Sequence, residues 1–387
     1  MNKNDLHQQP DALPVPEETE RERSARLASS IAAKIAVAGG WISFDHYMQE
    51  ALYSPGMGYY SADGHVFGAG GDFVTAPELG SLFARTLALQ CASVLNRLGG
   101  GDILEFGGGS GALMAELMLE LDRLGKLPER YRIIELSASM RARQRTMLLE
   151  RAPHCAERVE WLDSWPSSPW HGVALANEVL DAMPVRCFSL HEGEVFERGV
   201  SYRENAFVWS ERPADPDFSA AVLAALPEPP DRYPDGYQSE LNPSLAAWIA
   251  GLSENFAAGA ALLIDYGDLC AGRYHPARAQ GTLRAYYRHR TLNTPFWYPG
   301  LCDLTADVDF SGLSNAAVSA GFEIAALDTQ ANMLLAAGLE EVFAQSWEGA
   351  KDTQQQLRLA QEAKQLTLPG EMGERFRAIL LSRKMDL

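Results

Sequence analysis

The sequence ILEFGGGSGALMAEL, residues 103–117, decides the fold class. Its apolar start predicts a buried strand over 102–106, and its second half predicts a helix that begins near Gly111. The glycines, among them Gly107 and Gly109, allow a ligand to approach the backbone and to meet the N–H groups at the start of the helix. The spacing also satisfies the glycine pattern of dinucleotide-binding folds. A nucleotide-type cofactor and a purely structural glycine turn both remain open at this point.

Short apolar runs alternate with helical stretches along most of the chain. Further strands are expected at 131–136, 159–162, 173–176, 260–266, 322–327 and 376–381. Helical periodicity between most of these runs is typical of βαβ units, whose parallel sheet is covered by helices on both faces. The sequence therefore predicts an α/β fold.

Changes in this rhythm divide the chain into five expected segments. Residues 1–22 contain three prolines and six acids without hydrophobic periodicity, which predicts a disordered tail. Short alternating runs and a proline-rich acidic stretch predict antiparallel hairpins inserted at 186–243 on the substrate side. The other segments are an N-terminal helical and lid region at 23–98, the first half of a cofactor-binding domain at 99–185, and its second half with a helical addition at 244–387.

The composition excludes several classes of protein. The 387 residues include 51 Asp and Glu against 33 Lys and Arg, and this formal charge of −18 makes nucleic acid an unexpected partner. Five scattered cysteines and eight scattered histidines predict neither a disulfide framework nor a metal site. No signal or transit pattern and no run of 18 apolar residues occurs, which predicts a cytoplasmic protein without membrane insertion.

One segment departs from the overall acidity. Residues 273–302 contain five arginines, two histidines and no acids, with tyrosine, phenylalanine and tryptophan between them. Basic residues interleaved with aromatic ones can bind nucleic acid. A solvated arm or an interface to an acidic partner is the simpler interpretation of this segment.

Acidic residues follow two of the expected strands. Glu135 ends the second strand, where a carboxylate can accept both hydroxyl groups of a ribose. Asn177, Glu178 and Asp181 follow the fourth strand, at the sheet edge where ligands react. If a helical turn begins at Glu178, its carboxylate and that of Asp181 share one face and can hold a cation or take a proton from a donor. Ordinary acids at a helix start are the alternative.

The order of motifs resembles that of class I S-adenosylmethionine-dependent methyltransferases. The motifs are EFGGGSG at 105–111, IIELS at 133–137, ANEVLDAMPV at 176–185 and LIDYG at 263–267. More narrowly, ISFDHYMQEALYSPGMGYYS at 42–61 and FGAGGDFVTAPEL at 67–79 resemble the MidA family of proteobacterial and mitochondrial proteins. The resemblance spans roughly residues 40–383, including GTLRAYY at 281–287 and DLTADVDF at 303–310.

The resemblance implies a Rossmann-like fold with a mostly parallel seven-stranded sheet, an N-terminal helical lid, an inserted β-hairpin region and a helical C-terminal addition. It implies S-adenosyl-L-methionine as cofactor, S-adenosyl-L-homocysteine as product, and a protein arginine as acceptor. The mitochondrial members of the family methylate a core subunit of respiratory complex I and are needed for its assembly. A protein substrate is thus expected, and a homodimer stays open.

Site residues follow from the same resemblance. Those implied at the cofactor are Glu105, Gly107, Gly109, Gly111, Glu135, Asp163, Thr75, Pro77 and Glu78. Thr75, Pro77 and Glu78 would belong to a lid together with Gly71, Asp72 and Phe73. The implied catalytic residues are Asn177, Glu178 and Asp181, and the implied substrate-binding residues are Glu240, Asp265 and Tyr266.

Two departures from the family pattern concern the substrate side. Asp307 stands where the family usually has histidine, so a base or ligand role at that position is in doubt. Leu79–Ala84 also differs from the usual continuation after Thr-Ala-Pro-Glu. Three alternatives remain: a methyltransferase on RNA or a small molecule, a non-catalytic assembly factor that keeps the cofactor pocket, and an NAD-dependent dehydrogenase, which leaves the Asn-Glu motif without a role.

Overall fold

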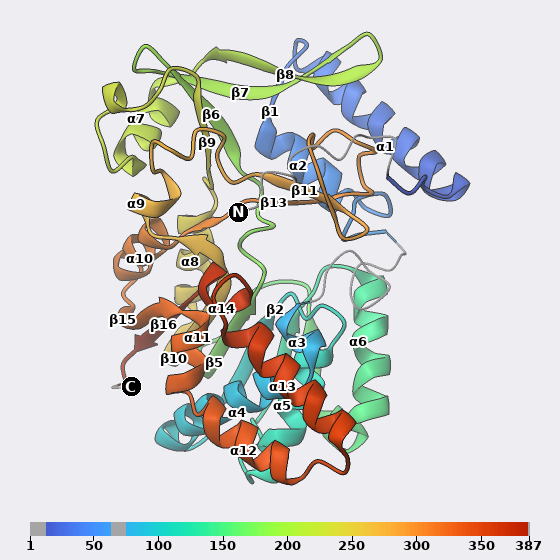
Figure 1. Ribbon diagram of the computed structural model, residues 1–387, viewed down its shortest axis with the longest axis vertical. Coiled ribbons are helices and arrows are strands. Elements are labelled where there is room, and N and C mark those ends of the chain that lie inside the picture. Colours follow the sequence, from blue (N-terminus) through green and yellow to red (C-terminus); the bar gives the residue numbers. More distant parts are fainter. Residues whose placement is uncertain (1–12, 63–74, 386–387) are drawn as a thin grey trace.

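The computed structural model describes residues 13–62 and 75–385, which form two lobes (Figure 1). The lower lobe holds the large sheet, and the upper lobe holds antiparallel strands and the N-terminal helices. Residues 1–12 of the expected tail lie outside the described residues. Helix α1 (Glu18–Val37) already begins within the rest of that segment, because Glu17 and Glu20 form a capping box. No helix in the described ranges is both long and apolar enough to cross a membrane.

The large sheet has the strand order β15–β16–β10–β5–β2–β3–β4. Its strands are β2 (Asp102–Phe106), β3 (Tyr131–Ile134), β4 (Val159–Leu162), β5 (Trp170–Asn177), β10 (Phe256–Asp268), β15 (Glu323–Thr329) and β16 (Phe376–Arg383). The five strands from β4 to β10 run parallel, and β16 lies antiparallel between β10 and β15. A short strand, β14 (Val308–Asp309), pairs with the end of β10. The predicted α/β fold with a mostly parallel sheet is confirmed.

The chain reverses its direction across the sheet between β2 and β5. From β2 it proceeds to β3 and β4, and it then returns to β5 and β10 on the other side of β2. In open α/β sheets, ligands bind at the carboxyl ends of the strands at such a point. Phe106 pairs with Ala176, so the glycine turn after β2 and Asn177 at the end of β5 leave the sheet side by side.

Helices cover both faces of this sheet. One core contains residues of α4 (Leu82–Leu98), α5 (Ala112–Arg123) and α6 (Ala138–Arg151). The other contains residues of α8 (Leu245–Glu254) and α10 (Phe310–Ser319). Because strand side chains alternate between the faces, Ile103 joins the first core and Leu104 the second.

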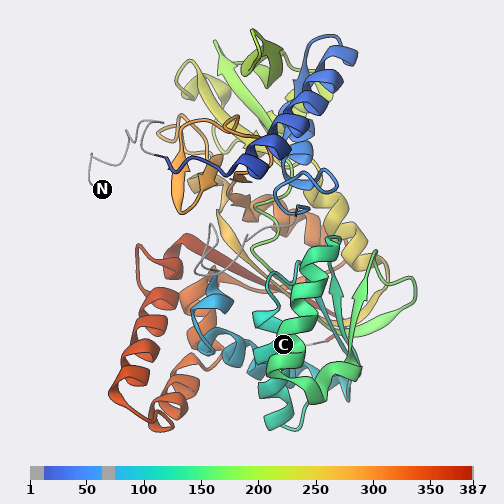
Figure 2. The same ribbon diagram turned by 90° about the vertical axis from the view of Figure 1, so that its right-hand side faces the viewer.

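Four helices between β15 and β16 form the C-terminal addition, which Figure 2 shows as a separate stack beside the sheet. They are α11 (Gln330–Ala336), α12 (Leu339–Glu348), α13 (Thr353–Thr367) and α14 (Met372–Arg375). The Glu362 carboxylate of α13 accepts a hydrogen bond of 2.6 Å from the Leu82 N–H at the start of α4. A Cβ atom at Gly80 would overlap Glu362. The amphipathic pattern of residues 78–98 predicts a single helix, but in the structure it is broken at Gly80, which separates α4 from α3 (Ala76–Leu79).

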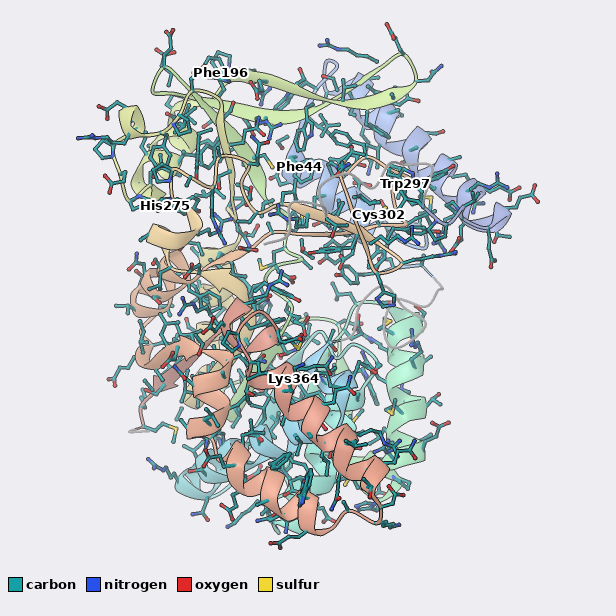
Figure 3. All side chains as sticks on the ribbon, in the orientation of Figure 1. Phe44, Phe196, His275, Trp297, Cys302 and Lys364 are labelled. Carbon is teal, nitrogen blue, oxygen red and sulfur yellow. The ribbon has the colours of Figure 1, made fainter. Side chains whose placement is uncertain are left out.

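The upper lobe joins the N-terminal region to the inserted segment. Its elements are α1, β1 (Ile42–Ser43), α2 (Phe44–Tyr53), β6 (Arg186–His191), β7 (Glu194–Arg203), β8 (Ala206–Pro213), α7 (Pro216–Ala225) and β9 (Tyr237–Leu241). The strand order is β1–β7–β6–β9, and β8 pairs with β7. The rings of Phe44, labelled in Figure 3, and Trp209 lie 4.9 Å apart between these two parts of the chain. The inserted hairpins are confirmed, and the N-terminal helices are packed against them.

A small sheet, β12 (Arg290–Leu292)–β11 (Arg284–Tyr287)–β13 (Asp303–Thr305), lies between the lobes. The arginine-rich segment 273–302 supplies two of its strands. The expected solvated arm is wrong for this segment, since Arg273, Tyr274 and Tyr287 are all buried. Short helices complete the described chain: α9 (Cys270–Arg273) and the 3₁₀ helices Pro153–Arg158 and Pro230–Arg232.

Candidate active site

The glycine turn after β2 has a backbone that side chains would disturb. Gly107, Gly109 and Gly111 have φ angles of 64°, 50° and 90°, which lie in the left-handed region that favours glycine. A Cβ atom at Gly108 would lie 3.0 Å from Ile133 and Gln144. The turn is thus held close to β3 and α6, and its opposite side faces a pocket at the start of α5.

This pocket brings together most of the residues implied at the cofactor. It is lined by Thr75, Pro77, Glu78, Glu105, Gly107, Gly108, Gly109, Ser110, Ala112, Leu113, Asn177 and Glu178. Glu78 accepts a hydrogen bond from the Ser110 hydroxyl, which ties the segment after residue 74 to the glycine turn. The other expected lid residues, Gly71, Asp72 and Phe73, lie outside the described residues. Gly111 shapes the turn without lining the pocket.

Two acids stand behind the glycine turn, the buried Glu105 and the half-buried Glu135. Glu105 is 3% exposed and accepts a hydrogen bond of 2.9 Å from the Tyr131 hydroxyl, and burial raises its pKa to about 7. Gln144 donates both to the Gly109 carbonyl, at 3.0 Å, and to the Glu135 carboxylate, at 3.1 Å. Burial also raises the pKa of Glu135. Gln144 therefore fixes Glu135 beside the glycine turn, where a ligand can extend from the pocket toward it.

Asp163 is placed differently from the other implied cofactor residues. It follows β4, its side chain is 86% exposed, and it forms an ion pair of 2.5 Å with Arg141. Arg141 also donates to the backbone carbonyls of Glu135 and Leu162. Asp163 therefore lies at the rim beyond Glu135, outside the pocket of the glycine turn.

The segment after β5 is a turn, so the helical turn considered for Glu178 does not form. Glu178 has a φ angle of 54°, a left-handed conformation that costs a residue with a side chain about 1–2 kcal/mol. The Asn177 amide donates to the Glu178 carboxylate at 3.0 Å, and the Asn177 Oδ1 atom is buried without a partner among the described atoms. A strained acid beside an unsatisfied acceptor is typical of a functional site.

Asp265 holds this turn in place. One of its carboxylate oxygens accepts the N–H groups of Val179, Leu180 and Asp181, at 3.1, 2.8 and 3.2 Å. The other oxygen accepts the N–H of Tyr266 at 2.8 Å. Asp265 is 1% exposed, so these four backbone donors replace water around its carboxylate. The structure thus gives Asp265 a positioning place rather than the expected substrate contact, whereas Tyr266 lines the cavity described next.

A cavity of about 700 Å³ adjoins the pocket, and both are lined by Thr75 and Glu178. Its wall also includes Tyr60, Asp181, Tyr266, Gly267, Asp268, Arg278, Arg284, Tyr286, Asp303, Thr305, Ala306, Asp307, Gly370, Glu374, Arg375 and Arg377. Asp303 of β13 is 4% exposed and accepts a hydrogen bond of 2.8 Å from the Tyr60 hydroxyl. Asp303 was not predicted as a site residue. The only sequence feature that pointed to it was the similarity of residues 303–310 to the family pattern, which gave Asp303 no particular role.

Glu178, Asp181 and Asp303 form an acidic cluster in the wall of this cavity. Burial, together with the negative charge of Asp265, raises the pKa of Glu178 to about 8. Burial and the charges of Asp265, Asp303 and Glu178 hold the pKa of Asp181 well above its ordinary value. The cluster therefore resists full ionisation, and a cation bound among these acids would favour their charged forms. No three His, Cys, Asp or Glu side chains in the described part of the chain are arranged to hold a metal ion.

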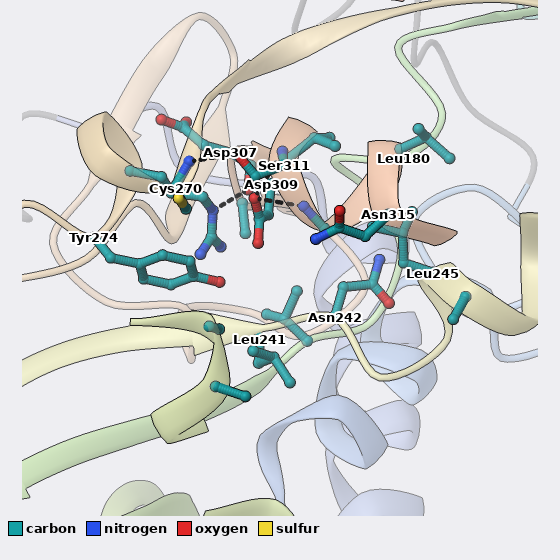
Figure 4. A pocket seen from close by; sticks show the side chains of 18 residues that line it. Leu180, Leu241, Asn242, Leu245, Cys270, Tyr274, Asp307, Asp309, Ser311 and Asn315 are labelled. Atoms are coloured by element: carbon teal, nitrogen blue, oxygen red, sulfur yellow. Dashed lines mark hydrogen bonds between the residues drawn. The ribbon is translucent and has the colours of Figure 1, made fainter. Parts of the chain in front are cut away.

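Glu240 does not reach this cluster, contrary to its expected substrate contact. Its carboxylate accepts the N–H of Thr282 at 2.7 Å and pairs with the buried Arg273 at 3.4 Å. Arg273 also borders a second cavity of about 310 Å³, which Figure 4 shows with Tyr274 and Asp309 in its wall. Glu240 thus ties the inserted segment to the chain that follows β10 through buried contacts with Arg273 and Thr282.

Asp307, which replaces the usual family histidine, lies between the two cavities and lines both. Burial raises its pKa, and it forms an ion pair of 3.3 Å with Arg278. Position 307 therefore holds a carboxylate that is paired with an arginine. This arrangement does not support a role of Asp307 as a base.

These features define a class of protein. A glycine turn after the first strand of the sheet, an acid after the second and an acidic cluster beside the cofactor pocket are the arrangement of a class I S-adenosyl-L-methionine-dependent methyltransferase. A sequence model of the family described as "Putative S-adenosyl-L-methionine-dependent methyltransferase" matches residues 86–327. The chain belongs to this family.

Relatives and solved structures agree with this placement. "Protein arginine methyltransferase NDUFAF7, mitochondrial" of Danio rerio is 28% identical over 380 residues, which cover 90% of this chain and 85% of the relative. The Homo sapiens protein of that name is 27% identical, with 87% and 79% covered. A crystal structure of a COG1565 superfamily member from Burkholderia thailandensis, bound to S-adenosyl-homocysteine, superposes with a TM-score of 0.91 at 43% identity, covering 97% of this chain and 96% of that one.

The described residues fit S-adenosyl-L-methionine, the cofactor of this family. The glycine turn leaves its backbone open to a ligand, the Asn177 Oδ1 atom offers an unused acceptor, and Glu105 and Glu135 provide carboxylates beside the turn. These acids suit the cationic and hydroxyl groups of such a molecule. When bound, the cofactor supplies a methyl group on a positively charged sulfur.

Replacing Gly109 with alanine should weaken cofactor binding at least about tenfold, because the new Cβ atom meets no protein atom within 4 Å and points into open space at the pocket. Gly125→Ala is a matched control, since Gly125 also has a left-handed backbone (φ 66°) and open surroundings but lies beyond α5. Calorimetric titration with S-adenosyl-homocysteine measures both variants. Equal affinities in the two variants would contradict the placement of Gly109 against the cofactor.

Proposed function

We propose that the protein transfers a methyl group from S-adenosyl-L-methionine to an arginine side chain of a protein partner. The observation that carries this proposal is the cavity in which Glu178, Asp181 and Asp303 lie together and which adjoins the cofactor pocket at Glu178. The named relatives are protein arginine methyltransferases, which supports an arginine acceptor. By the resemblance noted above, an arginine of a respiratory complex I subunit is the narrower form of the proposal.

The acids of the cavity suit a guanidinium group. A guanidinium presents several N–H donors in one plane and stays charged, with a reference pKa of roughly 12.5–13.8. Carboxylates that accept its N–H groups can orient one terminal nitrogen toward the cofactor pocket. Glu178 borders both spaces, so it is the acid that can accept the proton which the methylated nitrogen gives up. Asp181 and Asp303 would hold the rest of the group.

A binding experiment tests the acceptor directly. In the presence of S-adenosyl-homocysteine, fluorescence anisotropy should show that an arginine peptide binds at least about tenfold more tightly than the same peptide with citrulline, which is similar in shape but uncharged. Asp303→Asn should weaken binding of the arginine peptide and leave the citrulline peptide unchanged. Equal binding of the two peptides would contradict the proposed role of the acidic cluster.

The reaction should depend on the protonation of Glu178. Since the raised pKa keeps much of this acid protonated at neutral pH, kcat/KM for an arginine peptide should rise with pH and level off above about 8. Initial rates from about pH 6 to about pH 9 provide the profile. A rate that falls over this range would show that the protonated form of the cluster is the active one, contrary to the proposal.

The structure gives little support to RNA as the alternative acceptor. The aromatic residues of 273–302 that could stack on bases include Tyr274 and Tyr287, which are 1% and 3% exposed. Arg273, Arg278 and Arg288 of the same segment are paired with acids of the chain itself. The acidic cluster would also repel a phosphate backbone.

A further inference from the structure

The cavity that contains the acidic cluster also carries arginines. Arg278, Arg284, Arg375 and Arg377 line it. Arg278 and Arg377 form ion pairs with Asp307 and Asp268, at 3.3 and 2.8 Å. Their charges are therefore neutralised within the protein.

Arg284 and Arg375 differ from these two. Both are exposed, and neither forms a salt bridge with another described residue. Arg284 is the first residue of β11, and its guanidinium donates to the Leu283 carbonyl at 2.8 Å. Arg375 ends α14, and its guanidinium lies 5.6 Å from the centre of the Tyr266 ring. One arginine thus comes from the small sheet and the other from the C-terminal addition.

The charges of the cavity are ordered by depth. Asp181 and Asp303 are 6% and 4% exposed, whereas Arg284 and Arg375 are exposed to solvent. The guanidinium groups of Arg284 and Arg375 therefore lie nearer to solvent than the carboxylates of Asp181 and Asp303 do. Glu374 is an exposed acid of the cavity wall that, like the two arginines, forms no salt bridge with described residues. Its negative charge offsets one of their two positive charges.

We propose that Arg284 and Arg375 bind acidic side chains that flank the target arginine of the substrate. The inference rests on the proposed function and adds the sequence context of the acceptor. Exposed guanidinium groups that form no salt bridge can form paired hydrogen bonds with carboxylates, and guanidinium remains charged at any physiological pH. A peptide with a central arginine and acidic neighbours then matches the cavity in both charge and depth.

Peptide affinities test this surface. Fluorescent peptides with arginine flanked by glutamates, or by glutamines, are titrated with the protein in the presence of S-adenosyl-homocysteine. The glutamate peptide should bind about tenfold more tightly, and Arg284→Ala combined with Arg375→Ala should remove this difference. Arg203→Ala removes an exposed arginine at the end of β7 in the upper lobe and should leave the difference unchanged. Glu374→Gln should enlarge it.

Methyl transfer to the same two peptides is measured in parallel, so that a failure of this inference can be told apart from a failure of the proposed function. A glutamate preference that depends on the two arginines supports the surface even if neither peptide is methylated, in which case the proposed function fails. Equal affinity for the two peptides, no binding of either, or a preference that survives in the double variant overturns the inference, whatever the methylation assay shows.

Discussion

Glu178→Gln is expected to lower kcat for methyl transfer by at least about 100-fold while it leaves the affinity for S-adenosyl-homocysteine nearly unchanged. Glutamine keeps the size of the side chain and a carbonyl oxygen that can still accept the Asn177 amide, which donates at 3.0 Å in the structure. It removes the negative charge that borders both the cofactor pocket and the cavity. The loss should therefore fall on the chemical step.

Glu192→Gln is the matched control for this substitution. Glu192 is also a glutamate with a left-handed backbone, at φ 50°, but it is exposed in the turn between β6 and β7. Its replacement should leave both rates and affinities unchanged. Single-turnover rates and calorimetric affinities compare the two variants. An active Glu178→Gln enzyme would remove Glu178 from the reaction.

The same substitution also predicts a change in stability with pH. The pKa of Glu178 is about 8 in the folded protein against an ordinary value of 4.5. Between these values the folded state holds a proton that the unfolded state has lost, so the contribution of Glu178 to stability decreases as the pH rises through this range. Glu178→Gln should therefore be more stable than the native protein above pH 8, and melting temperatures on both sides of the range measure the difference.

Asp265→Ala is expected to destabilise the protein by about 3 kcal/mol or more, because it leaves four backbone N–H groups without their acceptor, two of them in buried hydrogen bonds and two in partly buried ones. Relief of repulsion with Glu178 and Asp181 offsets part of this loss. The turn that carries both acids should move, and a displacement of about 1 Å is enough to lower the rate about 100-fold.

Asp309→Ala is the comparison for this prediction. Asp309 also accepts two backbone N–H groups, those of Ser311 and Gly312 at 3.0 Å, but as a partly exposed cap of α10. Its loss should cost about 1 kcal/mol. Urea unfolding midpoints rank the two variants. If Asp265→Ala is no less stable than Asp309→Ala, Asp265 does not hold the turn as described.

Local sequence patterns were sufficient for the parts of the fold that depend on neighbours along the chain. The glycine turn, the parallel strands and the helices between them follow from apolar runs and glycine positions, and the structure agrees with them. Helix α1 begins inside the expected tail, because Glu17 and Glu20 form a capping box in an acidic stretch without hydrophobic periodicity. The break at Gly80 could not be predicted, since it depends on Glu362 far along the chain.

The site was predicted less completely because its acids meet through long-range pairing. Glu178 follows a recognisable strand, but its left-handed turn depends on Asp265, which is 87 residues further along. Asp303 reaches the cavity through the pairing of β13 with β11, which no local period indicates. Glu240 had the right residue type, yet its burial against Arg273 and Thr282 could be seen only in three dimensions.

The most direct test of the proposed function is to identify the atom that receives the methyl group. The protein is incubated with S-adenosyl-L-methionine carrying an isotopic label on its methyl group and with proteins of its own cell, and the labelled products are analysed by tandem mass spectrometry after digestion. We expect label on a terminal nitrogen of arginine, which is lost with Glu178→Gln and kept with Glu192→Gln. Label on lysine, on RNA or on a small molecule, in a reaction that still depends on Glu178, would contradict the proposed function.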